Sequence, residues 1–275
     1  MAGAVLEARD ISKQFRAPDG STIQALAPAS FSVEPLEFVS VVGPSGCGKS
    51  TLFNIVAGLE TQTTGTIRFE GKEVTSLRGR IAYQLQKDLL LPWRNILDNV
   101  ALGLEIRGTP RDERRERAMA LLRQYGLGAF AERFPSELSG GMRQRAALIR
   151  TLLFDRSIIL LDEPFGALDA QTRVLMQEWL RDLSRDTQKT ILLITHDIDE
   201  AIFLSSRVLV MSARPGSIRA DVAIDLPRSN ASDVLFEPRF AEYKRELFAM
   251  IREESLKAFE ASQLVPPPSM KAAAP

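Results

Sequence analysis

The sequence predicts an α/β fold in which a largely parallel sheet is interrupted by an inserted block of helices. Short apolar runs at Phe38–Val42, Ile158–Leu161 and Ile191–Thr195 are typical of buried parallel strands. A glycine-rich loop follows the first run and opens a helix. Between about Pro92 and Leu153 the pattern is helical and contains no good strand, so this segment is predicted as an insertion into the sheet.

The remaining strands are predicted from apolar patterning and from turn residues between the runs. Val5–Phe15 and Ile23–Phe31 are predicted as a strand pair, because Pro18–Ser21 has the composition of a turn. Further strands are predicted at Thr66–Phe69, Ile81–Leu85 and Arg207–Met211.

Three helices are predicted outside the inserted block. Lys49–Ala57 ends at Gly58, a residue typical of helix C-termini, and Thr172–Asp186 is amphipathic. Pro238–Phe259 carries apolar residues at helical spacing and is predicted to pack on the main domain or at a dimer contact. The last ten residues, from Pro266, are rich in proline and alanine and are expected to be disordered.

Composition excludes several functional classes. The chain has 35 basic and 35 acidic residues, so its formal charge of zero argues against a nucleic-acid-binding surface, and no nucleic-acid partner is expected. The chain has one cysteine, which cannot form an internal disulfide. One histidine and one cysteine are too few ligands for a zinc site. Any step that needs an imidazole must use His196.

From the sequence we expect neither a membrane span nor a secretory signal. No apolar stretch approaches the roughly 18 residues expected of a membrane-spanning helix. The N-terminus lacks a basic segment followed by an apolar one. We therefore expect the chain to reside in the cytoplasm.

The loop GPSGCGKST at Gly43–Thr51 matches the phosphate-loop pattern G-x-x-x-x-G-K-[S/T]. Its glycines allow backbone N–H groups to converge on a polyphosphate, and the following helix N-terminus adds partial positive charge. Lys49 is expected to reach the β- and γ-phosphates, and the Ser50 hydroxyl to bind Mg²⁺. Cys47 is most simply read as a small residue that contributes its backbone N–H.

Two acids end the strand in SIILLDEP, at the edge where open α/β sheets bind ligands. Asp162 is expected to hold Mg²⁺ directly or through water. Glu163 points elsewhere and is the candidate to polarise the attacking water.

A second phosphate-binding element lies at LSGGMRQR, Leu138–Arg145. The Ser139 hydroxyl caps a helix that starts at two glycines, a design that presents N–H groups to an anion. Because one chain carries two such elements, we expect them to meet across a dimer.

With GPSGCGKST, LLDEP and LSGGMRQR together, the chain resembles the ATP-binding subunits of ABC transporters over about residues 4–225. The resemblance implies a P-loop (RecA-like) ABC ATPase core with an antiparallel β subdomain and a helical subdomain inserted at about 92–153. It implies an ATPase domain over 1–228, with 229–275 forming a C-terminal helix and tail. ATP and Mg²⁺ are the implied cofactors, and ATP hydrolysis is the implied activity.

The resemblance also assigns individual roles. Phe15 matches the aromatic residue that stacks on adenine, Asp169 lies in the loop that crosses the dimer, and His196 matches the switch histidine at the γ-phosphate. Gln86 matches the glutamine that senses Mg²⁺ and the membrane subunit, but Gln84 lies two residues earlier and remains an alternative. The implied ATP contacts are Gly43, Pro44, Ser45, Gly46, Cys47, Gly48, Lys49, Ser50, Thr51, Phe15, Ser139, Gly140, Gly141 and Asp169. The implied catalytic residues are Glu163, His196, Gln86 and Lys49, and the implied Mg²⁺ ligands are Ser50, Gln86 and Asp162.

Leu36 departs from the family pattern. The family commonly has a glycine at this place, in the turn before the phosphate-loop strand. We expect a changed turn without an effect on function.

Within the family, the chain is most similar to importer subunits that pair with separate membrane proteins. Leu89–Gly108 and Ser212–Ile218 resemble importers for nitrate, sulfonates, taurine and related solutes. Pro92 and Trp93 are candidates for the groove that receives the membrane subunit. The implied partners are a second copy of the chain, integral membrane permease subunits and a periplasmic or lipid-anchored substrate-binding protein, with the chain at the cytoplasmic face of the membrane.

Two alternatives remain at this point. A non-transport ABC ATPase could act on a nucleic-acid or protein complex, although such proteins usually join two cassettes or insert a long coiled coil. A P-loop kinase that phosphorylates a small molecule would leave LSGGMRQR unexplained.

Overall fold

A computed structural model of the chain describes residues 3–227 and 231–263 and has two sheets. The strands are β1 (Leu6–Arg16), β2 (Thr22–Val33), β3 (Phe38–Val42), β4 (Thr64–Phe69), β5 (Lys72–Val74), β6 (Ala82–Gln84), β7 (Ile158–Asp162), β8 (Thr190–Ile194), β9 (Arg207–Met211) and β10 (Ile218–Ala223). One sheet is antiparallel, with strand order β2-β1-β4-β5. The other has strand order β10-β9-β3-β8-β7-β6, and only β10 in it is antiparallel to its neighbour. The predicted α/β class and antiparallel subdomain are therefore confirmed.

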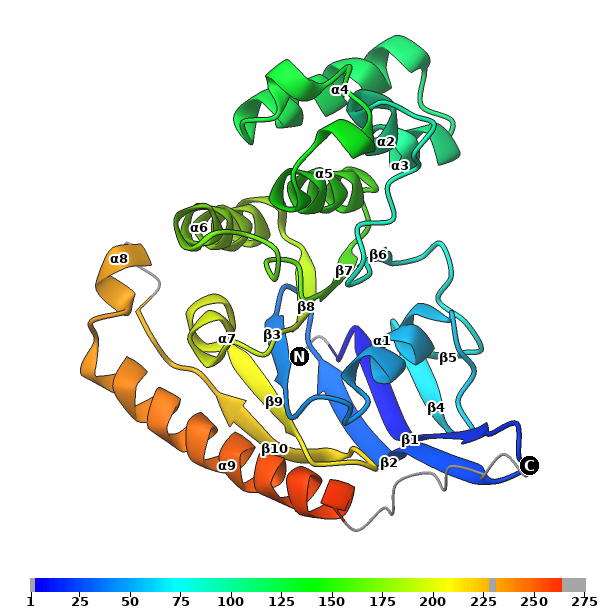
Figure 1. The fold of residues 1–275 in the computed structure, drawn as a ribbon, viewed down its shortest axis with the longest axis vertical. Coiled ribbons are helices and arrows are strands. Elements are labelled where there is room, and N and C mark those ends of the chain that lie inside the picture. Colours follow the sequence, from blue (N-terminus) through cyan, green and yellow to red (C-terminus); the bar gives the residue numbers. More distant parts are fainter. Residues whose placement is uncertain (1–2, 228–230, 264–275) are drawn as a thin grey trace, which may run out of the picture.

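The helices form an inserted region, a layer on the sheet and a C-terminal element. They are α1 (Lys49–Ala57), α2 (Ile96–Val100), α3 (Leu102–Ile106), α4 (Arg111–Gln124), η1 (Gly128–Phe130), η2 (Pro135–Glu137), α5 (Gly140–Leu153), α6 (Ala170–Thr187), α7 (Ile198–Leu204), α8 (Ala231–Val234) and α9 (Pro238–Gln263). Figure 1 shows α2–α4 as an upper lobe above α5, with the sheets below. Within the described residues, no helix is both long and apolar enough to cross a membrane.

The buried strands separate two hydrophobic clusters because successive side chains point to opposite faces. Phe38 and Val42 of β3 face a cluster that includes α5 and the inserted helices, whereas Val39 and Val41 face a cluster with α1 and the antiparallel sheet. The sheet thus has α1 and the antiparallel sheet on one face and the helical lobe on the other, with the phosphate loop at the end of β3.

Helix α9 packs against α7 and β9, as Figure 1 shows along the lower edge of the molecule. Phe240 and Leu247 are buried in the same cluster as the helical lobe, and Met250 and Ile251 pack against it. The C-terminal helix is therefore joined to the ATPase core by an apolar face. The tail from Pro266 lies outside the described residues.

Some elements were not predicted from the sequence. β5 has three residues, and β10 alternates half-buried and exposed positions, so neither has the apolar run that indicates a buried strand. Leu36 adopts φ 66°, the left-handed conformation that favours glycine, and its N–H donates to the Thr190 hydroxyl at 2.9 Å. The turn thus adopts a glycine-like conformation with a leucine in place.

Candidate nucleotide-binding site

The phosphate loop connects β3 to α1 and is shaped by its glycines. Gly46 and Gly48 have φ of 74° and 109°, values that residues with a Cβ atom adopt only at a cost in energy. A Cβ atom on Gly48 would also lie 2.6 Å from Leu26 Cδ2. Lys49 is buried, and its Nζ donates to the carbonyl oxygens of Gly43 at 2.8 Å and Pro44 at 3.0 Å. The lysine charge is therefore held against the loop, where a polyphosphate would lie.

Cys47 lies inside this loop, and its side chain is 1% exposed. Burial raises the pKa of its thiol. A buried thiol with a raised pKa is a poorer nucleophile, which agrees with the interpretation of Cys47 as a small loop residue.

Asp162 and Ser50 supply two adjacent oxygen donors. The Asp162 carboxyl is buried at the end of β7; burial raises its pKa, and a hydrogen bond with Ser50 opposes that rise. Tyr83 also lies beside the Asp162 carboxyl, and its hydroxyl donates to Asn54 Oδ1 at 3.1 Å. A hydroxyl beside a carboxylate is a donor set that suits Mg²⁺, so these residues fit the ion that the sequence implied.

Glu163 is held in a strained backbone conformation. Its φ is 49°, and its N–H donates to the Ile194 carbonyl at 2.9 Å. The carboxylate meets Gln86 Nε2 at 3.0 Å and His196 Nδ1 at 3.6 Å. A small hollow of about 10 Å³, the size of a single water site, opens beside Glu163 and His196. Gln86 and His196, which come from separate parts of the sequence, therefore converge on the Glu163 carboxylate, next to space that water can enter.

Gln84 and Gln86 have different surroundings. Gln86 is exposed and contacts Glu163, whereas Gln84 is 1% exposed on β6. Side-chain alternation directs Gln84 to the face opposite Tyr83, and its Oε1 has no hydrogen-bond partner within the described part of the chain. Of the two glutamines, Gln86 is the one that reaches the carboxylates.

Phe15 lies near the end of β1 and is 36% exposed. The Lys13 ammonium group lies 4.8 Å from the centre of its ring. An exposed aromatic ring such as this one can stack on a planar base.

The second phosphate-binding element opens α5. The Ser139 hydroxyl accepts the Met142 N–H at 3.3 Å, and Ser139 and Gly140 are exposed. A Cβ atom on Gly140 would be 3.8 Å from its nearest neighbour, whereas one on Gly141 would lie 3.3 Å from the Ala167 carbonyl. Asp169 is also exposed and caps α6 by accepting the Thr172 N–H at 3.0 Å. These groups face outward and are free to meet another molecule.

Two connecting residues were not singled out from the sequence. The Gln144 side chain donates to the Glu163 carbonyl at 2.9 Å and accepts the Ala167 N–H at 2.7 Å. Arg143 pairs with Asp88 at 3.1 Å, just after Gln86. Both lie within LSGGMRQR, so their position in the motif was the available signal; their contacts depend on tertiary packing.

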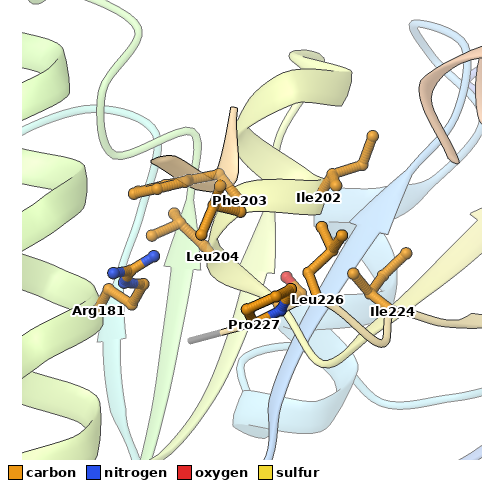
Figure 2. A pocket seen from close by; sticks show the side chains of 9 residues that line it. Arg181, Ile202, Phe203, Leu204, Ile224, Leu226 and Pro227 are labelled. Atoms are coloured by element: carbon orange, nitrogen blue, oxygen red, sulfur yellow. The ribbon is translucent and has the colours of Figure 1, made fainter. Parts of the chain in front are cut away.

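A separate pocket lies between α6, α7 and the segment after β10 (Figure 2). It is small, about 20 Å³, and is lined mainly by apolar side chains such as Ile202, Leu204 and Leu226. The Arg181 guanidinium lies 4.7 Å from the centre of the Phe203 ring. The pocket contains none of the phosphate-loop residues or hydrolytic carboxylates and is not a nucleotide site.

Comparisons with known proteins agree with this geometry. The ABC transporter family model matches residues 26–166. The chain is 46% identical over 242 residues to the taurine import ATP-binding protein TauB of Rhizobium johnstonii. This alignment covers 86% of this chain and 92% of that protein. It is 40% identical over 262 residues to the nitrate import ATP-binding protein NrtD of Synechocystis sp., covering 93% and 98% of the two chains.

Solved structures show the same fold. The dimeric structure of a bacterial ABC transporter cassette superposes with a TM-score of 0.73 and 31% identity, covering 80% of this chain and 99% of that one. A dimeric post-hydrolysis cassette bound to ADP and Pi gives the same TM-score at 30% identity and the same coverage. By fold, by motif geometry and by similarity along its length, the chain belongs to the ABC transporter family of ATP-binding proteins and is an ABC-type ATPase.

Proposed function

We propose that the chain is the ATP-hydrolysing subunit of an importer and energises uptake of a small solute through separate membrane subunits. The observation that carries the proposal is the convergence of Gln86 and His196 on Glu163, beside the Ser50–Asp162 pair. This arrangement joins a hydrolytic carboxylate to groups that respond to the γ-phosphate. Relatives of 40–46% identity whose names describe import subunits support the transport role.

Two copies would bind ATP head to tail. Each nucleotide would lie between Gly43–Thr51 of one copy and Ser139–Gly141 of the other, with Phe15 against the base and Asp169 near the dimer contact. The exposure of Ser139 and Gly140 supports this arrangement, because N–H groups at an exposed helix N-terminus are accessible to a phosphate bound by another copy. The dimeric state named for similar cassettes supports it as well.

The hydrolytic roles follow from position and charge. Ser50, Asp162 and Gln86 would hold Mg²⁺, which when bound neutralises phosphate charge. Glu163 would orient the nucleophilic water and accept its proton. Lys49 and His196 would stabilise charge on the γ-phosphoryl group. Closure of the dimer would exclude bulk water from these groups.

Gln86 is proposed as the residue that couples the nucleotide to the membrane subunit. Its contact with Glu163 supports this choice over the buried Gln84. Gln86→Ala is expected to lower transport per ATP hydrolysed in the assembled transporter. A larger coupling loss in Gln84→Ala would overturn the choice.

The surface beside Gln86 supports a membrane partner. Trp93 and Leu89 are 72% and 52% exposed. Leu89 also lines a hollow of about 480 Å³, formed by Gln86–Leu90 and by α5 residues including Arg143. An exposed leucine at this hollow, with an exposed tryptophan four residues later in the chain, fits a helix segment of a permease that carries both apolar and polar side chains. The chain would then lie at the cytoplasmic face of the membrane.

The proposed cargo is a small solute of the nitrate, sulfonate and taurine class, delivered by a periplasmic or lipid-anchored binding protein. This assignment rests on similarity to the import subunits for taurine and nitrate.

The test is copurification followed by uptake. The tagged chain is isolated from gently solubilised membranes, and partners are identified by mass spectrometry. Integral permease subunits are the expected partners, and proteoliposomes containing them should accumulate labelled taurine or nitrate with ATP but not with Lys49→Ala. Recovery with ribosomes or DNA, and no permease, would favour the non-transport alternative. ATP consumption that depends on a small phosphate acceptor would favour a kinase.

A further inference from the structure

Glu254 is a buried acid on α9, away from the hydrolytic residues. It is 3% exposed. Its Oε1 is paired with Arg219 of β10 and accepts from Lys257 Nζ at 2.8 Å, while its Oε2 accepts the Ala213 backbone N–H at 2.8 Å. A buried carboxylate is expensive unless all its oxygens are paired, so this contact orders both the helix and the backbone that it meets.

The Ala213 N–H belongs to the turn Ser212–Ser217, which connects β9 to β10. Within the turn, the Ser212 N–H donates to the Ser217 carbonyl at 2.9 Å, and the Ser217 N–H donates to the Ser212 hydroxyl at 3.0 Å. The turn is thus closed on itself and attached to α9 through Glu254. A displacement at Ala213 must therefore move the turn as a unit.

The other side of the turn lies against the phosphate loop. A Cβ atom on Gly216 would lie 2.0 Å from the Cys47 carbonyl oxygen, so the two backbones are in direct contact. The Gly216 carbonyl also accepts the Ala27 N–H at 2.9 Å. At the start of the loop, a Cβ atom on Gly43 would lie 2.9 Å from the carbonyl oxygen of Met211, the last residue of β9. The phosphate loop therefore rests at two points on the end of β9 and its turn.

We propose that Glu254 is a positioning residue for ATP binding, through which α9 sets the place of the phosphate loop. The proposal rests on the proposed function, in which Gly43–Thr51 binds ATP. Removal of the Glu254 carboxylate leaves the Ala213 N–H unpaired and loosens the turn on its α9 side, while the bond from the Ala27 N–H still holds the Gly216 carbonyl. The turn can then shift, and with it the contact between Gly216 and Cys47. Because the loop N–H groups bind phosphate only when they converge, a small shift lowers affinity.

Binding and turnover of the full chain test this proposal. Glu254→Met keeps side-chain length and removes the acceptor, whereas Glu254→Gln keeps one oxygen for the Ala213 N–H. The matched control is Glu253→Gln, because Glu253 also pairs with Arg219 at 2.5 Å and Lys257 at 2.9 Å but lies on the exposed side of α9. The readouts are Kd for Mg²⁺ with a non-hydrolysable ATP analogue, KM and kcat for ATP, and Tm.

We expect Glu254→Met to raise Kd and KM about tenfold while kcat stays within about twofold. Glu254→Gln should restore Kd to within about threefold of the wild type, and Glu253→Gln should match it. A folded Met variant with a lower Tm and wild-type Kd would make Glu254 merely structural and overturn the proposal. An equal rise in Kd in Glu253→Gln would also overturn it.

Hydrogen exchange of the wild type covers the case in which the Met variant does not fold. Because coupling is reciprocal, the analogue should slow amide exchange at Ala213 and Gly216. Unchanged exchange at saturating analogue would overturn the proposal alone. A wild-type chain that binds no ATP analogue would overturn the proposed function and, with it, this proposal.

Discussion

The two phosphate-binding elements of this chain are built in opposite ways. The first, which we call the braced element, comprises Gly43–Thr51, Asp162 and Glu163 and is held in place by contacts within the chain. Lys49 is buried against loop carbonyls, Asp162 is buried beside Ser50, and Glu163 contacts both Gln86 and His196. The second, at Ser139–Gly141, is exposed, and its hydroxyl only caps its own helix. The side chains of the braced element are thus held in position before a ligand binds. Ser139–Gly141, which we call the exposed element, is accessible from solvent.

The braced element also carries the strain. Glu163 has φ 49°, and burial raises the pKa values of Asp162 and Glu200 around it. Left-handed backbone and buried acids are each unfavourable by roughly 1–3 kcal/mol and persist where the surrounding structure enforces them. The exposed element has no such feature among the described residues. This contrast is what a shared site requires, with chemistry in one copy and a relaxed contact surface in the other.

The largest expected effect is at the centre of the braced element. Glu163→Gln removes the proton acceptor but keeps the hydrogen-bonding shape, so hydrolysis should fall about 100- to 10,000-fold while ATP binding is retained. The variant should accumulate as an ATP-bound dimer in size-exclusion chromatography. Phosphate release at near wild-type rate would remove Glu163 from the base role.

A substitution in the exposed element should separate dimer function from ATP binding. Gly140 is helical, and a Cβ atom there meets only the flexible Arg143 side chain, at an ordinary contact distance of 3.8 Å, so Gly140→Gln should fold normally. We expect ATP affinity of the isolated chain to stay within about twofold while hydrolysis falls about 100-fold, because the side chain obstructs the partner's phosphates.

Ser136→Gln is the matched control, since Ser136 is exposed and lies three residues before the exposed element begins at Ser139. It should hydrolyse ATP normally. Loss of ATP affinity in Gly140→Gln would contradict the division into two elements, because it would place Gly140 in the same-chain site.

The acids behind the braced element predict a pH effect on stability. Burial raises the pKa of Glu200 to about 7; Gln177 and Thr195 donate to its carboxyl, Asp197 raises the pKa and Arg173 lowers it. The pKa of Glu200 is therefore higher in the folded chain than in the unfolded chain. The contribution of Glu200 to the free energy of unfolding is fully present below about pH 4.5 and is lost as pH rises through about 7.

Glu200→Gln removes the charge and should raise the free energy of unfolding by about 2 kcal/mol above pH 7. The gain should vanish below about pH 4.5, as measured by urea denaturation across pH. Glu246→Gln, at an exposed acid on α9, should give no such pH-dependent gain. A Glu200→Gln gain that does not vary with pH would show that burial of this charge does not strain the braced element.

The contrast between the elements also explains what could be predicted from the sequence. Contiguous motifs contain Gly43–Thr51, Asp162 and Ser139–Gly141. The chemistry of such motifs can be inferred from the sequence before the fold is known. The parallel strands were predictable because they are short apolar runs that end in turns. β10 was not, because Arg219 and Asp221 interrupt its apolar pattern on an edge that needs only one buried face.

Contacts between distant segments were beyond sequence reasoning. Gln84 and Gln86 could not be separated until strand pairing placed one of them inside the sheet and the other against Glu163. The double contact of Gln144 depends on how α5 meets the segment after β7. The roles of the individual site residues stay predictions that the experiments above test.

The smallest expected effect concerns the strand that leads into the braced element. Leu36 is 56% exposed and has φ 66°, a conformation that disfavours a side chain by roughly 1 kcal/mol. Glycine removes that penalty but adds about 0.5 kcal/mol of backbone entropy to the unfolded chain, so Leu36→Gly should gain about 0.5 kcal/mol. Leu59→Gly is the control, because Leu59 is 46% exposed without a positive φ and should lose stability. If Leu36→Gly also loses stability in urea denaturation, the leucine contributes packing that outweighs its strain, and the turn before β3 is itself part of the bracing.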